Sequence, residues 1–139
     1  MSKKIVITGG LGYIGTELCK IYSGVSWNNE ILVIDNRFVS ERVSQLRNWD
    51  IDFVHGDILN KDLVNRYCKD ADIVHHLAGI TDVPRLKSES SDDKDAKIKL
   101  VAEEGTQNIL DVISDKCKII FPSSHVVYEG IEKVKNDML

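Results

Sequence analysis

The chain has 139 residues, of which 42% are hydrophobic and 29% are charged, and these proportions are typical of folded globular proteins rather than disordered or collagen-like chains. Eighteen basic and 22 acidic residues give a formal net charge of −4 without a basic stripe, so we expect no nucleic-acid partner. No apolar run approaches the ~20 residues of a membrane span, and no signal-peptide pattern opens the chain, so we expect a cytoplasmic protein with no membrane partner.

Apolar residues along the chain predict strands and helices in alternation. Short runs rich in β-branched residues predict five buried strands, at residues 3–8, 31–34, 52–55, 72–77 and 118–121. Apolar residues spaced three and four apart predict four helices, at residues 13–23, 41–47, 62–69 and 92–113. Such alternation with short connections is typical of right-handed βαβ crossovers. We therefore expect residues 1–139 to form one doubly wound α/β domain, a parallel sheet with helices on both faces.

Two further features set limits on the chemistry. Cys19, Cys68 and Cys117 lie far apart without a CxxC pair or clustered histidines, so we expect reduced thiols, no disulfide and no metal site. Residues 86–95 (LKSESSDDKD) form a polar stretch that reads as a solvated connection. Because it follows the fourth predicted strand, a lid or substrate-contacting role is the alternative.

The glycine-rich segment TGGLGYIG, residues 8–15, lies where the first predicted strand turns into the first predicted helix. A diphosphate can approach backbone N–H groups only where no Cβ intervenes, and a helix N-terminus adds partial positive charge. The segment fits GxGxxG through Gly10, Gly12 and Gly15 as well as GxxGxxG through Gly9, Gly12 and Gly15. Spacing alone does not choose between them, and a tight turn without a ligand also favours glycine.

Asp35 supplies the second part of a dinucleotide pattern. It lies twenty residues after Gly15, at the end of the second predicted strand, where a carboxylate can accept hydrogen bonds from ribose hydroxyls. Its charge would repel the 2′-phosphate of NADP, so the pattern favours NAD. Arg37 and Arg42 follow closely and can neutralise a phosphate, so NADP stays the alternative, although arginines after a strand are more often ordinary surface residues.

Six motifs occur in order along residues 4 to about 130: TGGLGYIG, VIDN, HGDI, HHLAG, EGTQNIL and PSSHVVYEG. With them the chain resembles the extended short-chain dehydrogenase/reductase family, and in particular its NAD-dependent sugar-nucleotide epimerases and dehydratases. The resemblance implies a Rossmann-type fold, NAD as cofactor, a nucleotide-sugar substrate in the complete protein, and a homodimer.

The resemblance also implies roles for individual residues. The GxxGxxG register becomes the operative one, with Tyr13 and Ile14 flanking the cofactor. The other implied cofactor contacts are Gly9, Gly12 and Gly15 at the phosphates, Asp35 and Asn36 at the ribose, Asp57 and Ile58 at the adenine, Leu77, Ala78 and Gly79 at the nicotinamide ribose, and Ser123. Without the family, Asp57 after Gly56 reads as a turn residue. His75 and His76 read as satisfied strand-end histidines with no catalytic role.

Ser124 is the catalytic candidate, because it lies four residues before Tyr128, as the family's Ser/Thr lies before its VYG tyrosine. Its hydroxyl would bond the reacting sugar hydroxyl. Outside this motif, a serine at a strand end is usually a capping or turn residue. Thr81, Asp82, Val83 and Arg85 border the expected crevice as weaker substrate candidates.

The family's tyrosine base, paired with a lysine as YxxxK, is missing. The residues four after the tyrosines are Glu17, Ser26, Ala71 and Glu132. Ala102 also replaces the family's Asn before Gly105-Thr106, and Glu129 interrupts the VYG pattern.

We therefore expect the dinucleotide-binding portion of an epimerase or dehydratase, incomplete at the carboxyl end, lacking the substrate region and inactive alone. The alternatives are a noncatalytic NAD(P)-binding regulatory module and half of a split protein. In an incomplete fold, apolar surface is expected near Val126 and Val127 and along one helix at Ile98, Val101 and Ile109.

Overall fold

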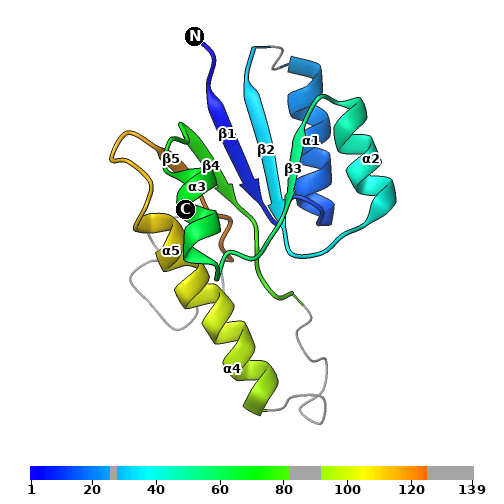
Figure 1. Ribbon diagram of the computed structural model, residues 1–139. Coiled ribbons are helices and arrows are strands. Elements are labelled where there is room, and N and C mark those ends of the chain that lie inside the picture. The colour runs from blue at the N-terminus through cyan, green and yellow to red at the C-terminus, as the bar shows by residue number, and fades with distance from the viewer. Residues whose placement is uncertain (26–27, 82–91, 125–139) are drawn as a thin grey trace, which may run out of the picture.

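A parallel sheet is the centre of the computed structural model, which describes residues 1–25, 28–81 and 92–124. Its five strands are β1 (Lys4–Thr8), β2 (Glu30–Asp35), β3 (Asp52–His55), β4 (Ile73–His76) and β5 (Lys118–Ile120). All four neighbouring pairs are parallel, and the order is β3-β2-β1-β4-β5 (Figure 1). The predicted Rossmann-type doubly wound fold is confirmed.

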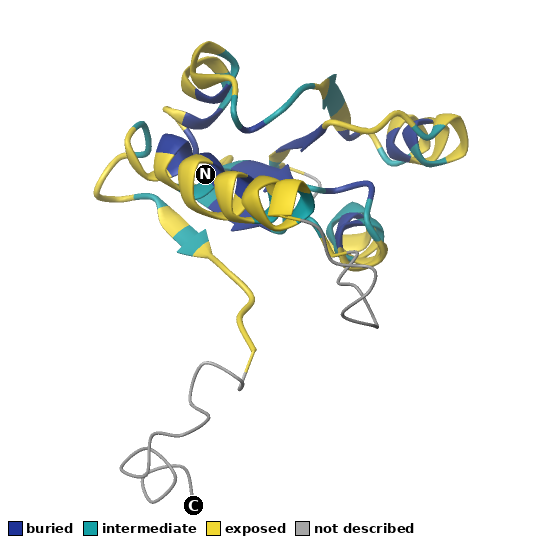
Figure 2. Ribbon diagram, turned by 90° about the horizontal axis from the view of Figure 1, so that it is seen from below, coloured by how far each residue is buried: buried dark blue, intermediate teal, exposed yellow. Residues whose placement is uncertain are grey.

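Helices cover both faces of this sheet, as Figure 1 shows. They are α1 (Tyr13–Val25), α2 (Ser40–Asn48), α3 (Lys61–Cys68), α4 (Asp92–Leu100), the π-helical turn η2 (Val101–Gly105) and α5 (Thr106–Leu110). The period-2 alternation of β1 divides the core between the two faces. Ile5 and Ile7 pack with α1 and α2, whereas Val6 packs with α3 and α5. Figure 2 shows the buried central strands between helices whose outer surfaces are exposed, whereas the edge strands β3 and β5 contain no buried residue.

The last long helix differs from its prediction over residues 92–113. It is divided by η2 and ends at Leu110. Residues 92–95 were predicted both in this helix and in the polar loop; they form the first turn of α4, so the helix prediction is confirmed there and the loop prediction was wrong. Aspartates at 92, 93 and 95 stabilise a helix N-terminus. Residues 86–91 of that predicted loop lie outside the described residues.

Apolar surface was predicted in the wrong place on this helix. Val101 and Ile109 are buried in the cluster beneath α3, and Ile98 is half-buried. Val126 and Val127 lie outside the described residues. The exposed apolar side chains include Leu100 of α4 and Leu110 of α5, and others lie on α1 and at the end of β5: Ile14, Ile21, Val25, Ile120 and Phe121.

The strand order indicates which edge of the sheet can bind a ligand. From β1 the chain proceeds to β2 and β3 on one side, then returns to β4 and β5 on the other. The connections that leave β1 and β4 therefore run to opposite sides of the sheet, and open α/β sheets bind ligands at the carboxyl ends of the strands at such a reversal. In Figure 1, α4 projects beyond the same edge.

The described residues contain neither a membrane-spanning helix nor a disulfide. None of their helices has the length and apolar character to cross a bilayer. The cysteines are free, and burial raises the pKa of Cys19 to about 12 and that of Cys68 to about 11, so both are neutral thiols with little nucleophilic character.

Candidate cofactor site

The glycine loop after β1 closely approaches the turn after β4. Gly9 has a φ of 69°, a left-handed conformation that favours glycine, and donates its N–H to the Ile34 carbonyl at 2.8 Å. A Cβ at Gly9 would lie 2.7 Å from both the N and the Cα of Ala78. Backbone atoms of the two loops thus meet at the point where the sheet order reverses, and only glycine fits there.

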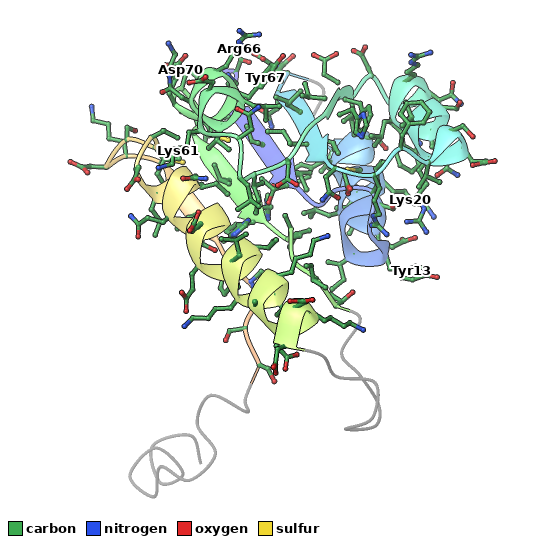
Figure 3. All side chains as sticks on the ribbon, turned by 60° about the horizontal axis from the view of Figure 1, so that its bottom comes forward. Tyr13, Lys20, Lys61, Arg66, Tyr67 and Asp70 are labelled. Atoms are coloured by element: carbon green, nitrogen blue, oxygen red, sulfur yellow. The ribbon has the colours of Figure 1, made fainter. Side chains whose placement is uncertain are left out.

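The first turn of α1 presents backbone amides. The Gly12 N–H bonds the Gly9 carbonyl at 3.1 Å, and the first helical bond runs from the Thr16 N–H to the Gly12 carbonyl at 2.9 Å. The amides of residues 13–15 precede that bond and have no acceptor within the helix. The Tyr13 and Ile14 side chains are 86% and 69% exposed, and Figure 3 shows Tyr13 pointing outward. The helix start can therefore receive an anion.

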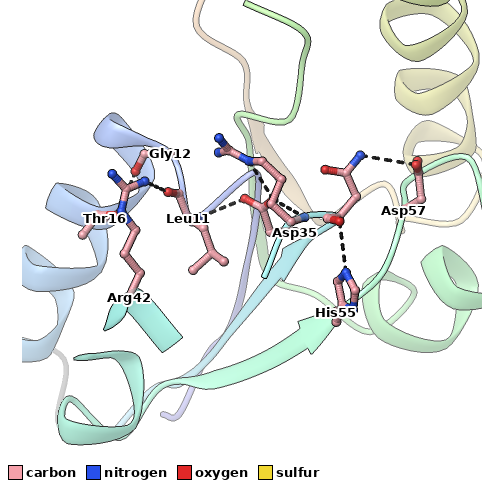
Figure 4. A network of polar contacts seen from close by, with 9 residues as sticks. Leu11, Gly12, Thr16, Asp35, Arg42, His55 and Asp57 are labelled. Carbon is pink, nitrogen blue, oxygen red and sulfur yellow. Dashed lines mark hydrogen bonds and ion pairs between the residues drawn. The ribbon is translucent and has the colours of Figure 1, made fainter. Parts of the chain in front are cut away.

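Asp35 anchors the other side of this loop. Its side chain is 3% exposed, and its Oδ2 accepts the Leu11 N–H at 2.9 Å (Figure 4). Its Oδ1 accepts the Arg37 N–H at 3.0 Å and lies 3.6 Å from the Arg37 Nε. A carboxylate offers about four lone-pair sites, so acceptor capacity is left for a ribose hydroxyl. The structure therefore places the carboxylate beside the helix start, as the dinucleotide pattern requires.

The implied adenine contacts join Asp35 at the neighbouring strand end. Asp57 accepts the Leu59 N–H at 2.9 Å and the Asn36 side-chain amide at 3.4 Å, and the Asn36 carbonyl lies 3.0 Å from His55 Nε2. Figure 4 shows this chain of contacts connecting β2 to the loop after β3. Asn36, predicted at the ribose, and Asp57, predicted at the adenine, are thus hydrogen-bonded to each other, whereas the Ile58 side chain belongs to the hydrophobic core.

Asn108 is a site residue that sequence reasoning missed. It is buried, and its Nδ2 donates to the Ile58 carbonyl at 3.0 Å. The Ile58 side chain is buried against Gly105, where a Cβ would lie 2.4 Å from Ile58 Cδ1. The sequence feature that could have indicated Asn108 is its position as a polar residue on the same helix face as Gly105 and Ile109.

The turn after β4 is held by His76 and two threonines. The Ala78 N–H donates to Thr8 Oγ1 at 3.3 Å, and Thr8 Oγ1 lies 2.8 Å from His76 Nδ1. His76 Nε2 lies 2.9 Å from Thr106 Oγ1, while the neighbouring His75 bonds the Tyr22 hydroxyl at 2.7 Å. Both rings are buried and hydrogen-bonded, which agrees with structural rather than catalytic histidines.

These buried histidines predict acid sensitivity. Burial lowers the pKa of His76 and of His75, so the unfolded chain takes up these protons more readily than the folded protein. Stability is therefore fully present above the ordinary histidine pKa of ~6.5 and falls as the pH drops below it. We expect urea midpoints to decrease from about pH 7.5 to about pH 5.5. His76→Gln should make this dependence shallower; a slope equal to that of the unsubstituted chain would contradict this explanation.

The catalytic candidate lies at the same edge. Ser123 and Ser124 are exposed and follow β5, whose carboxyl end lies beside that of β4. Thr81 is also exposed, whereas Asp82, Val83, Arg85 and Tyr128 lie outside the described residues. Within the described ranges, no group of three or more metal-ligating side chains occurs.

Comparison with known proteins gives consistent matches. A family model described as the 3-beta hydroxysteroid dehydrogenase/isomerase family matches residues 6–137. The CDP-paratose 2-epimerase of Salmonella typhi is 31% identical over 144 residues, covering 95% of this chain and 40% of that protein. The UDP-N-acetyl-alpha-D-glucosaminuronate decarboxylase of Bacillus cytotoxicus is 30% identical over 132 residues, covering 92% and 38%.

A solved relative shares the fold. The UDP-glucose 4-epimerase from Bifidobacterium longum, in complex with NAD+ and UDP, superimposes with a TM-score of 0.72 at 26% identity. The match covers 91% of this chain and 38% of that one. The chain thus spans 38–40% of the length of these relatives.

Proposed function

The chain belongs to the extended short-chain dehydrogenase/reductase family of NAD-dependent epimerases and dehydratases, and on this basis we propose that it is the NAD-binding portion of an enzyme that acts on a nucleotide-sugar. The observation that carries the proposal is the joint placement of the unpaired helix-start amides and the buried Asp35 carboxylate at the reversal of strand order. The names of the relatives support the substrate class.

The residues present fit a dinucleotide. At Gly9 and Gly15 a side chain would clash with backbone, so the loop keeps close to the start of α1 and leaves its amides accessible. Asp35 suits the neutral ribose hydroxyls of NAD and opposes the 2′-phosphate of NADP. Arg37 and Arg42, the residues that favoured NADP, contact Asp35 and the Leu11 carbonyl respectively.

The proposed chemistry divides between cofactor and protein. Bound NAD supplies an acceptor for a hydride from a sugar carbon. The residues of this chain hold the diphosphate at α1, the ribose at Asp35 and the adenine at Asp57 and Ile58. Ser124, at the carboxyl edge beside β4, bonds the reacting sugar hydroxyl. We propose that Ser123, the residue before it, contacts the cofactor.

We expect calorimetric titration of this chain to show one NAD site, with NADP binding at least about tenfold more weakly because its 2′-phosphate would lie beside a buried carboxylate. Tighter binding of NADP would overturn the cofactor assignment. Absence of binding by both dinucleotides would overturn the proposed function.

A noncatalytic NAD-binding module is the second candidate, since no tyrosine in the sequence precedes a lysine by four residues. The two candidates differ in the reading frame after Leu139. A YxxxK pair downstream in the same frame supports the portion of an enzyme, whereas a stop codon together with stable, monomeric NAD binding supports the module.

A further inference from the structure

We propose that Arg42 is a positioning residue of the cofactor loop, which it holds in the anion-receiving conformation from the adjacent helix α2. The inference rests on the proposed NAD-binding function and extends it to a residue outside the family motifs. Arg42 donates from its guanidinium to the Leu11 carbonyl, and the same group lies 5.2 Å from the centre of the Tyr13 ring. Figure 4 shows Arg42 extending from α2 to the loop.

The backbone of Leu11 and Gly12 shows what this contact achieves. The Leu11 N–H bonds Asp35, and the Gly12 N–H bonds the Gly9 carbonyl. The Gly12 carbonyl accepts from Thr16 through its N–H and through its hydroxyl at 2.7 Å. The Leu11 carbonyl is the fourth polar group, and its side-chain donor is Arg42. Every backbone donor and acceptor of these two residues is therefore paired.

The peptide group between Leu11 and Gly12 is fixed at both ends by these bonds. Its carbonyl is held by Arg42 and its N–H by Gly9. Rotation of this group would move a carbonyl dipole and change the direction from which the chain enters α1. Since Gly12 precedes Tyr13, where the helix begins, the plane of this peptide sets the direction of the following amides. Arg42 thus acts on a diphosphate through the loop rather than by touching it.

The Tyr13 ring completes the arrangement. A guanidinium over an aromatic face is attracted by the ring quadrupole, which restricts both side chains. Arg42 also lines an open groove between α1 and α2 together with Tyr13, Gln45 and Trp49. Because the site is a groove and not a packed core, an unbranched apolar replacement is expected to fold.

The test compares Arg42→Met with Arg47→Met, which removes the same charge from an exposed position on the same helix. We expect Arg42→Met to weaken NAD and ADP-ribose about tenfold, as loss of one charge-assisted hydrogen bond predicts, and to leave adenosine affinity unchanged. Arg42→Lys should recover part of the loss. Arg47→Met should match the unsubstituted chain.

Two readouts separate positioning from other effects. If Arg42 acts by positioning, its loss accelerates hydrogen exchange at the Gly12 amide without cofactor, and the weaker NAD binding persists from about 0.05 M to about 0.5 M sodium chloride. A defect that disappears at high salt, an equal defect in Arg47→Met, or unchanged exchange at Gly12 would overturn the proposal. If the unsubstituted chain binds no NAD, the proposed function fails as well; if it binds and Arg42→Met binds equally, only this inference fails.

Discussion

Gly9→Ala is expected to lower the free energy of unfolding by about 2–5 kcal/mol and to abolish measurable NAD binding. The added Cβ would lie 2.7 Å from backbone atoms of Ala78, which cannot rotate away as a side chain does. The φ of 69° adds strain for any residue with a Cβ. Relief requires the loops after β1 and β4 to separate, and that separation moves the glycine loop away from its position at the sheet edge. Urea unfolding and NAD calorimetry measure the two effects.

Gly24→Ala is the matched control. Gly24 lies in α1, and a Cβ there would have nothing within 4 Å. Alanine is the better helix former by about 1 kcal/mol, so this variant should be as stable as the parent or more stable, with NAD affinity unchanged. Equal stability of Gly9→Ala and Gly24→Ala would contradict the close approach of the two loops.

Asp35→Asn is expected to weaken NAD binding about 30- to 100-fold, a larger effect than at any other polar residue of the site. The carboxylate accepts the Leu11 and Arg37 N–H groups and, in our proposal, a ribose hydroxyl. An asparagine keeps the shape but has one acceptor oxygen, so its NH2 must face one of these donors. The loss of NAD affinity should therefore have two causes, a weaker contact with the ribose and a displaced glycine loop.

The same variant tests cofactor choice. Removing the negative charge leaves the Arg37 guanidinium beside the ribose position, so NADP should lose less affinity than NAD, and the preference for NAD should narrow. Asp52→Asn removes a charge from an exposed position on β3 and should change neither affinity. If Asp35→Asn bound both dinucleotides as the unsubstituted chain does, the carboxylate would have no role in recognition.

The local part of this architecture could be predicted from the sequence. Buried strands such as residues 3–8 and the glycine loop depend on short-range patterns, and the spacing from Gly15 to Asp35 follows from one βαβ unit. The structure brings these elements together as expected. The division of the long helix at η2 was not predicted; Gly105, which ends η2, packs closely against Ile58, 47 positions earlier in the chain.

The supporting contacts could not be predicted for the same reason. Asn108 bonds a carbonyl 50 positions away, and His76 connects Thr8 to Thr106 across 68 and 30 positions. From the sequence, Arg42 was interpreted as an ordinary surface residue or as a group that neutralises a phosphate, whereas it bonds a loop carbonyl 31 positions earlier. No local pattern specifies such partners, because they are set by how helices pack on the sheet.

An NMR titration of the 15N-labelled chain with NAD tests directly whether the N–H groups at the start of α1 receive the diphosphate. We expect the largest amide shifts at Tyr13, Ile14 and Gly15, with smaller shifts around Asp35. Saturable NAD binding that leaves these amides unchanged, and shifts residues elsewhere, would contradict it.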